Sequence, residues 1–521
     1  MEIQLWKACF DGNVREVHKL LQSQQINTNY QNSNGWTPFL IACSKGHIEE
    51  VKLLLNDRRV DTNKAENSTG ATPFFIACQN GHTEIVELLL NDKRVDVNKA
   101  NKNEATPVYI TCQNGYIEII KLLLKDERVD INKVKNDSIS PFWIACCKGH
   151  IEIVKLLLND NRVDINQAKN GSWTPFWIAC QNGHLEIVKL LLNDQRVDIN
   201  KADNEYDRTP FYIASEKRHI AVIKLLLNDQ RVDINKAKNS GVTPFYIACK
   251  EGQIEIVRLV LNDQRVDINK ADEDGSTPFF IACENEHMEI VKWLLNDQRV
   301  DINKAEKYGI TPFCIACWNG YIKIVKLLLS DGRVDINKAD EDGSTPFLIA
   351  CQEGHIEIVK LLLNNERINI NQTSDNGQTP FYIACQNEHL EVVKLLLNDK
   401  RVETNIANDE SKTPFLIACF YGHLEIVKYL LECGKEININ EKDNDGKTGL
   451  DWARERGNED WEDEENFENR KRNCSKIVEV IESFQKRSEK ERKKREEEEK
   501  KKLAAEERKR VADTKKKLEE E

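Results

Sequence analysis

Cysteine and histidine recur four positions apart along much of the chain, as in Cys43 with His47 and Cys180 with His184. Thiolate and imidazole are ligands that Zn²⁺ prefers, so these pairs raise the question of a metal site. A helix-breaking residue stands between the two members of each pair, so we expect the cysteine to point into a helix pair and the histidine to open the next helix. Zinc needs four ligands at about 2.0 to 2.3 Å, and these pairs are spread over successive repeats. We therefore interpret the cysteines as small apolar core residues and expect no metal and no cofactor.

Two other groups could support catalysis. Cys314 and Cys317 form one CxxC motif, but no second pair accompanies them. Ser215 replaces a cysteine of the repeat and has only His219 nearby as a general base. The sequence contains no phosphate-binding glycine loop, zinc-protease motif or kinase motif. We expect a protein that is not an enzyme.

The prolines reveal the elements that position all these residues. Consecutive prolines lie 34 residues apart, with two steps of 35, at Pro38, Pro73, Pro107, Pro141, Pro175, Pro210, Pro244, Pro278, Pro312, Pro346, Pro380 and Pro414. Threonine precedes most of them and can cap a helix whose first position is the proline. A second apolar stripe at helical spacing follows, for example Ile290, Val291 and Leu294. Each repeat therefore predicts an antiparallel helix pair that is stable only when stacked on its neighbours.

The recurring text T-P-F-x-I-A-C-x-N-G-H-x-E-I-V-K-L-L-L resembles the ankyrin repeat family over residues 1–485. The resemblance implies an all-α repeat solenoid, with stacked ankyrin helix pairs and projecting β-hairpin loops. We expect an N-terminal capping repeat at 1–34, twelve repeats at 35–445 and a degenerate capping repeat with an acidic insertion at 446–485. The second helix of that last repeat is expected at Ser475 to Phe484. The charged tail at 486–521 is expected to be a single helix, a coiled coil or a disordered segment.

Three features depart from the family pattern. Helix two ends in Asn-Asp instead of Gly-Ala, so we expect Asn or Asp to take the left-handed cap position. The residue two after proline is usually large and apolar instead of histidine, which predicts an aromatic column. The asparagine of the Asp-Ile-Asn step, as in Asn132, Asn166, Asn200, Asn269 and Asn337, matches a residue that resembles a hydroxylation target in some ankyrin proteins. We favour a loop-bracing amide as its role.

Composition narrows the choice of partner and compartment. Lys and Arg total 75 against 87 Asp and Glu, for a net charge of −12, so we expect no general affinity for nucleic acid. No apolar run approaches the roughly 18 residues of a membrane span, and the start of the chain lacks the pattern of a secretory signal. The sixteen cysteines are spread along the chain, as in proteins whose thiols stay reduced. We expect a cytoplasmic protein, with the nucleus as the alternative.

Function is then expected to reside on the surface. The family resemblance implies that the concave face and the loop tips bind one or more proteins. Large side chains occupy variable positions just before the proline or at the end of helix one, which makes them candidate binding residues: Trp36, Ile139, Trp173, Arg208, Ile310, Trp318, Phe420 and Tyr421. Packing against the next repeat is the alternative role for these residues. We predict a non-catalytic scaffold or adaptor. The alternatives are a regulatory subunit of a separate enzyme and a cytoskeletal or membrane-tethering rod that uses the charged tail.

Overall fold

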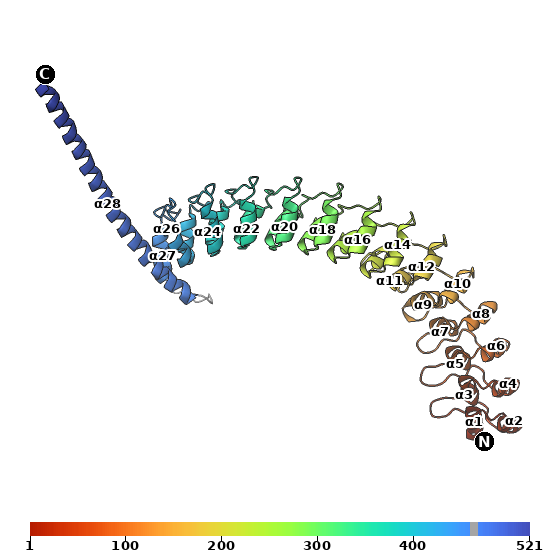
Figure 1. The fold of residues 1–521 in the computed structure, drawn as a ribbon. Helices are drawn as coiled ribbons and strands as arrows, with labels where there is room; N and C mark the ends of the chain where they lie inside the picture. Colours follow the sequence, from red (N-terminus) through yellow and green to blue (C-terminus); the bar gives the residue numbers. More distant parts are fainter. Residues whose placement is uncertain (459–466, 521) are drawn as a thin grey trace. The chain divides into compact units, whose positions relative to one another are not determined.

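The computed structural model of the chain describes residues 1–458 and 467–520, which form helices and no strand. The helices divide into two compact units, Met1–Glu273 and Asp274–Glu521. Within each unit the helices follow one another in pairs along the chain (Figure 1). The all-α class predicted from the repeats is confirmed.

The first unit contains eight helix pairs. The first helices of these pairs are α1 (Glu2–Asp11), α3 (Pro38–Lys45), α5 (Pro73–Asn80), α7 (Pro107–Asn114), α9 (Pro141–Lys148), α11 (Pro175–Gln181), α13 (Pro210–Glu216) and α15 (Pro244–Lys250). The second helices are α2 (Val14–Leu21), α4 (Ile48–Asn56), α6 (Thr83–Leu90), α8 (Ile117–Lys125), α10 (Ile151–Leu158), α12 (Leu185–Leu192), α14 (Ile220–Leu227) and α16 (Ile254–Leu261). A short 3₁₀ helix, η1 (Asn136–Ser138), lies in the loop before α9.

The second unit repeats the arrangement and ends differently. Its first helices are α17 (Pro278–Glu284), α19 (Pro312–Trp318), α21 (Pro346–Gln352), α23 (Pro380–Gln386), α25 (Pro414–Tyr421) and α27 (Gly449–Asn458). Its second helices are α18 (Met288–Leu295), α20 (Ile322–Leu329), α22 (Ile356–Leu363), α24 (Leu390–Asn398), α26 (Leu424–Glu432) and α28 (Phe467–Glu520).

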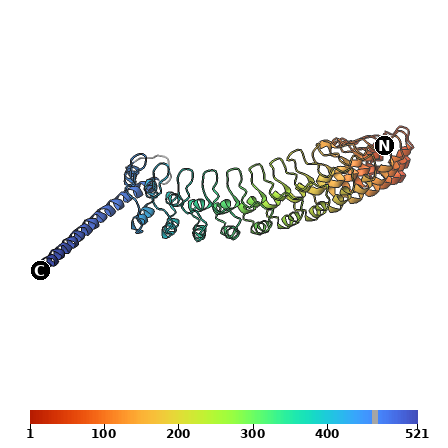
Figure 2. The ribbon, with the colours of Figure 1, turned by 90° about the horizontal axis from the view of Figure 1, so that it is seen from above.

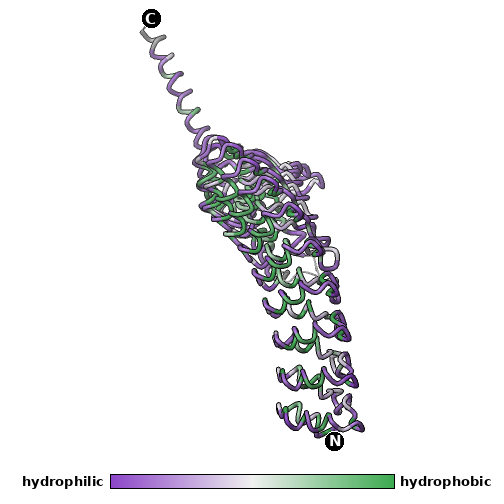
Figure 3. Tube along the Cα trace, turned by 90° about the vertical axis from the view of Figure 1, so that its right-hand side faces the viewer, coloured by the Kyte–Doolittle hydropathy of each residue, from purple (hydrophilic) through white to green (hydrophobic). Residues whose placement is uncertain are grey.

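Each first helix begins as the Thr-Pro step predicts. The hydroxyl of Thr277, for example, accepts a hydrogen bond from the backbone N–H of Phe280 at 3.1 Å, and Pro278 occupies the first helical position. Helices of seven or eight residues are marginal in isolation, so packing must hold them together. Phe279, Ile281 and Cys283 are buried against the second helix and the neighbouring repeats. Figure 3 shows the hydrophobic residues gathered in the helices, while the loops and the tail are hydrophilic.

The second helices do not end as expected. The residues after them have ordinary right-handed or extended backbones, as at Asn91 (φ −74°) and Asp57 (φ −87°), so the predicted left-handed Asn or Asp cap is wrong. An arginine of the following repeat binds the free carbonyl group instead. Arg94 donates to the carbonyl oxygen of Leu55 at 2.7 Å and is held in place by Asp92. The same bond recurs from Arg59, Arg128, Arg162, Arg196, Arg231, Arg265, Arg333 and Arg401.

The loops project from the helix pairs, as the second unit shows in Figure 2. The expected β-hairpins are reduced to tight turns, and only two loops of the described residues form an antiparallel bridge, Lys135 with Ile139 and Lys169 with Trp173. Asparagine side chains join neighbouring loops. Asn132 donates to the carbonyl oxygen of Arg162 at 2.6 Å and accepts from the N–H of Asp164 at 2.8 Å. Asn166, Asn200 and Asn337 bond in the same way, as predicted for a loop-bracing amide.

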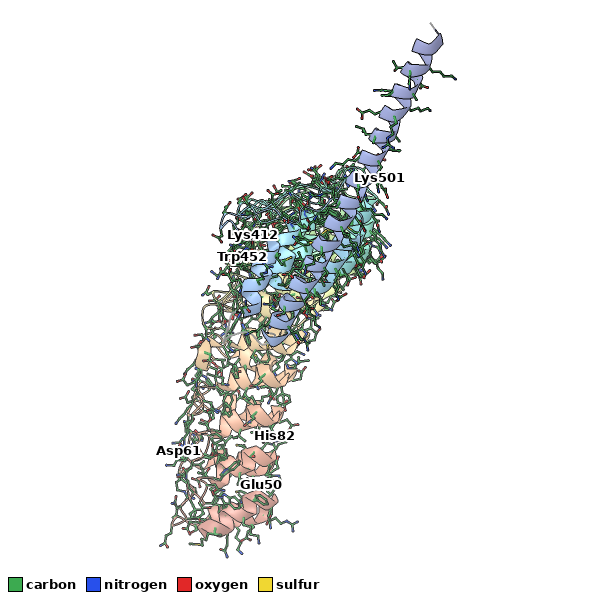
Figure 4. All side chains as sticks on the ribbon, turned by 90° about the vertical axis from the view of Figure 1, so that its left-hand side faces the viewer. Glu50, Asp61, His82, Lys412, Trp452 and Lys501 are labelled. Carbon is green, nitrogen blue, oxygen red and sulfur yellow. The ribbon has the colours of Figure 1, made fainter. Side chains whose placement is uncertain are left out.

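The last helix differs from the expectation for the capping repeat. α28 begins at Phe467, ahead of the predicted start at Ser475, and continues without a break into the charged tail. In the first part of α28, Ile477 and Ile481 are buried, whereas the described side chains from Lys486 onward are exposed. Lys501 lies on this exposed part (Figure 4). Most of the acidic insertion, residues 459–466, lies outside the described residues.

Candidate functional site

Within each unit, loops and first helices line a hollow, and three of the candidate residues border one, namely Trp36, Phe420 and Tyr421. We call the surface formed by the loops and the first helices of a unit its groove. The hollow of the first unit has a volume of about 360 Å³. Trp36 lines it together with Phe75 and Tyr109, and polar groups are provided by Gln79, Gln113 and Lys135. Trp36 is only partly buried, so its ring contributes apolar surface to the groove.

Three more candidates of the first unit lie at the same position of their loops. Trp173 is partly buried, and its ring centroid lies 6.1 Å from that of Trp177. Ile139 is partly exposed. Arg208 is used inside the repeat, because it pairs with Asp203 at 2.9 Å and approaches Glu216 at 3.6 Å. Arg208 therefore presents less free charge than its position in the sequence suggests.

In the second unit Trp318 is the most exposed of the candidate residues. Its side chain lies at the end of α19 and is 39% exposed. Its backbone carbonyl oxygen is bonded by the imidazole Nε2 of His355 at 2.8 Å. Ile310 is partly exposed, and its N–H donates to Glu306. An indole of this size in contact with water is a suitable anchor for a partner.

Phe420 and Tyr421 are less available than the sequence suggested. Packing against the next repeat, the alternative role expected for these residues, is found for Phe420, and Tyr421 is partly buried. The Phe420 ring packs edge-on against Trp452 at 4.9 Å between centroids. Lys412 lies over both rings, and Figure 4 shows Lys412 beside Trp452.

A second hollow, of about 420 Å³, remains next to this cluster. It is lined by Tyr382, Gln386, Lys412, Phe420 and Tyr421. The hollow is rimmed mainly by amide and charged groups, so it combines aromatic walls with hydrogen-bonding edges. Both aromatic candidates at the end of α25 therefore take part in a groove while also packing within the chain.

The cysteine and histidine pairs do not converge. Cys180 is buried and burial raises the pKa of its thiol, whereas His184 turns away and bonds the carbonyl oxygen of Cys147 through Nε2 at 3.0 Å. The imidazoles of the other repeats make the same bond to the preceding repeat, at His47, His82, His150, His219, His355, His389 and His423. Among the described residues, no group of three or more His, Cys, Asp or Glu could hold a metal ion.

The candidate nucleophile and the CxxC motif are also structural. The Ser215 hydroxyl donates to the carbonyl oxygen of Phe211 at 2.9 Å, while His219 bonds the carbonyl oxygen of Gln181. The two side chains are therefore directed to different partners. Cys314 and Cys317 are both buried free thiols, and burial raises the pKa of Cys314 to about 12. A thiol with so high a pKa is a poor nucleophile at neutral pH.

Two lysines of the groove were missed by sequence reasoning. Lys135 and Lys169 occupy equivalent places at the start of successive loops and lie over aromatic rings. The signal was present in the sequence, because most other repeats have Asn, Asp, Glu or Ser at this place. These lysines lie outside the two variable positions, just before the proline and at the end of helix one, that supplied the candidate residues.

One further observation concerns membranes: no described helix combines the length and the apolar character that crossing a bilayer requires. In a comparison with curated proteins, no match to the chain was found. A family described as ankyrin repeats, in groups of three copies, matches at residues 5–101, 93–169, 161–238, 195–272, 245–340, 315–408 and 400–461. These matches span nearly all the helix pairs described above, and the chain therefore belongs to the ankyrin repeat family.

Proposed function

We propose that the chain is a non-catalytic scaffold or adaptor that captures partner proteins in the grooves of its repeats. Ankyrin repeats generally serve as modules for protein interaction. The observation that carries the proposal is the exposure of Trp318 at the end of α19, where most repeats have a polar residue. An exposed indole is also the kind of side chain that serves as an anchor in protein interfaces.

The opposite side of the helix pairs supports this assignment of the binding surface. Lys292 and Lys360 lie on second helices, where each pairs with a glutamate three residues earlier at 2.7 Å. These exposed pairs contribute little to stability or recognition. The groove offers Trp318 as an anchor, and the outer face of α22 offers a solvated surface, whereas α18 also exposes Trp293 beside Lys292 by 38%.

The test uses the full chain as bait in a quantitative pull-down. Truncation of a central aromatic anchor typically costs about 2 kcal/mol or more, so Trp318→Ala should reduce capture of specific partners at least about tenfold. The matched control is the double variant Lys292→Ala and Lys360→Ala. Loss of partners with the control, together with unchanged capture by Trp318→Ala, would show that the binding surface lies on the outer face.

The exposed part of α28 favours a second candidate function, that of a tethering rod. Its described side chains are exposed from Lys486 to Lys516. Removal of residues 486–521 should then change the location of the protein in cells while leaving groove-dependent capture intact. Unchanged location would count against tethering.

A further inference from the structure

The residue that opens each loop turn usually caps the turn with its own side chain. The Oδ1 atom of Asn101 accepts hydrogen bonds from the N–H groups of Asn103 and Ala105, each at 3.0 Å. Such bonds satisfy backbone donors that the turn would otherwise leave to water. Equivalent bonds are accepted by Asn32, Glu66, Asp203, Glu306, Asp340, Ser374, Asn408 and Asp443.

Lysine holds this place at Lys135, Lys169 and Lys238, all in the first unit. An ammonium group can only donate, so it cannot cap the turn. These loops close through backbone bonds, such as that from the N–H of Lys169 to the carbonyl oxygen of Trp173 at 3.0 Å. Closure of the turn therefore does not explain the lysines, and a residue that breaks a local rule points to a role outside the turn.

The side chains of Lys135 and Lys169 extend to aromatic rings. The Nζ atom of Lys135 lies 5.5 Å from the centroid of the Tyr109 ring. The Nζ atom of Lys169 lies 5.7 Å from the ring of Trp143 and 5.4 Å from that of Trp173. Within the part of the chain that the structure describes, neither lysine has an ion pair with a carboxylate, in contrast to Arg208. The ammonium groups of Lys135 and Lys169 therefore lie near aromatic rings, and no carboxylate of the described residues neutralises them.

The rings around these lysines add one unsatisfied donor. The indole N–H of Trp143 donates to the carbonyl oxygen of Trp173 at 2.8 Å, and that of Trp177 donates to the carbonyl oxygen of Arg208 at 2.9 Å. The indole N–H of Trp173 is buried, and none of the described residues accepts a hydrogen bond from it. The surface around Lys135 and Lys169 therefore offers positive charge and aromatic rings.

We propose that Lys135 and Lys169 recognise two carboxylates of an acidic peptide segment that lies extended along the first helices α7, α9 and α11. The inference rests on the proposed function, because it specifies the chemistry of one partner. Neighbouring helices pack about 8 to 10 Å apart. In an extended segment of polyproline II type, with three residues per turn and a rise of about 3.1 Å, residues three apart lie on the same side about 9 Å apart, so the carboxylates belong three residues apart. Apolar side chains between them contact Ile139 and Trp173.

A protein segment fits this groove better than a nucleic acid. Binding to a phosphate backbone relies on many clustered cations, whereas here two lysines stand in a chain of net charge −12. Two well-placed carboxylates would instead balance the two ammonium groups one to one. Long-range attraction of the whole chain for acidic partners is unfavourable, so the specificity must come from this local arrangement.

The direct test measures binding of a fluorescein-labelled peptide with the sequence Ala-Glu-Leu-Ala-Glu-Leu-Ala to the full chain by fluorescence anisotropy. The double variant Lys135→Glu and Lys169→Glu should weaken binding at least tenfold, and a peptide with Gln in place of Glu should not bind. The matched control is Lys121→Glu with Lys155→Glu, which makes the same change in charge on α8 and α10. Its peptide affinity should equal that of the unchanged protein.

Three outcomes would overturn the inference. The first is equal weakening by both double variants, which would show only general charge attraction. The second is tighter binding of oligothymidylate than of the peptide, with the same dependence on Lys135 and Lys169. The third is absence of peptide binding while partner capture through Trp318 persists, which leaves the scaffold function intact. Absence of any groove-dependent capture would instead contradict the scaffold function itself.

A separate measurement tests whether lysine is kept at a cost to the fold. The loop of Lys238 has its positive φ at Gly241, as the loop of Asn32 has at Gly35. Lys238→Asn should therefore restore the side-chain cap and raise the melting temperature. A lower melting temperature would show that lysine serves the turn itself and would overturn the argument that turn closure does not explain the lysines.

Discussion

The guanidinium group of Arg59 donates a hydrogen bond to the carbonyl oxygen of Leu21, 2.9 Å away in the preceding repeat. Leu21 ends α2, where the carbonyl groups of the last turn lack partners within the helix. Asp57 holds the guanidinium in position through bonds at 2.6 to 3.2 Å. One side chain therefore closes a helix and joins two repeats.

Replacement of Arg59 by lysine should destabilise the chain by about 1 kcal/mol, because lysine lacks the planar fork that bonds Asp57 and Leu21 together. Urea unfolding followed by circular dichroism measures the change. Arg58→Lys is the control, since Arg58 is exposed, and it should leave the unfolding midpoint unchanged. An equal effect of both substitutions would contradict a capping role for Arg59.

The Asp–Arg pairs also predict acid sensitivity. The hydrogen bond from Arg59 lowers the pKa of Asp57, and arginines lower the pKa of Asp92, Asp126, Asp160, Asp194, Asp229, Asp263, Asp331 and Asp399 in the same way. A carboxylate with a lowered folded-state pKa contributes stability above its unfolded value near 3.9. That stability is lost as the pH falls through the folded-state value.

The free energy of unfolding should therefore decrease steeply below about pH 5. Urea titrations at successive pH values measure the slope. Asp57→Asn should make the slope shallower while lowering stability at neutral pH. If the pH dependence of the unfolding free energy does not change with this substitution, the Asp57–Arg59 pair is not a source of the acid sensitivity.

Glu50 is a buried carboxylate in α4 and is predicted to weaken the first repeats. It is 3% exposed, and none of the described residues donates a hydrogen bond to its Oε1 atom. The equivalent residues of the next repeats are Ile85 and Ile119. Glu50→Ile should stabilise the chain by about 1 to 3 kcal/mol, because it removes an unsatisfied buried group. Glu49→Ile on the exposed side should change the unfolding midpoint little, and a destabilising Glu50→Ile would contradict this account.

Glu286 adopts a left-handed backbone (φ 57°) at the place where other repeats have glycine, as at Gly354. Such a conformation costs a residue with a Cβ atom about 1 to 2 kcal/mol. Glu286→Gly should therefore raise the melting temperature. Gly354→Ala should lower it, because a Cβ atom there would lie 2.6 Å from Nδ1 of His389. A lower melting temperature for Glu286→Gly together with a higher one for Gly354→Ala would disprove the explanation.

Thiol reactivity should separate two cysteines from the others. Cys147 and Cys433 are partly exposed, whereas the remaining cysteines are buried. Titration of the native chain with a thiol reagent should modify Cys147 and Cys433 first, and the buried thiols should react only after unfolding. Rapid reaction of a core thiol such as Cys283 would show that the helix pairs open readily.

The sequence predicted the helix pairs well, because each begins with a local signal that needs no knowledge of its neighbours. Thr277 and Pro278 cap and start a helix through contacts within four residues. The ends of the second helices were mispredicted, since the group that closes them comes from the next repeat. Arg94 lies 39 residues beyond Leu55, and no local pattern connects the two.

The candidate site shows the same limit. The exposure of Trp318 follows from its own position in the repeat, and it was predicted. The covering of Phe420 depends on Trp452, which belongs to a repeat without the proline and with an irregular second helix. The contact between Phe420 and Trp452 can be recognised only from the three-dimensional arrangement of the last repeats.

Within each unit, asparagine and arginine bonds connect neighbouring repeats, and this affects how the chain loses structure. Asn132 and Arg162 act between adjacent loops, so an inner repeat is held from two directions and an outermost repeat from one. Energies that act between nearest neighbours produce unravelling from the ends, one layer at a time, under heat or mechanical tension. A molecule pulled by its termini would lengthen in steps, and each step would release the length of one repeat.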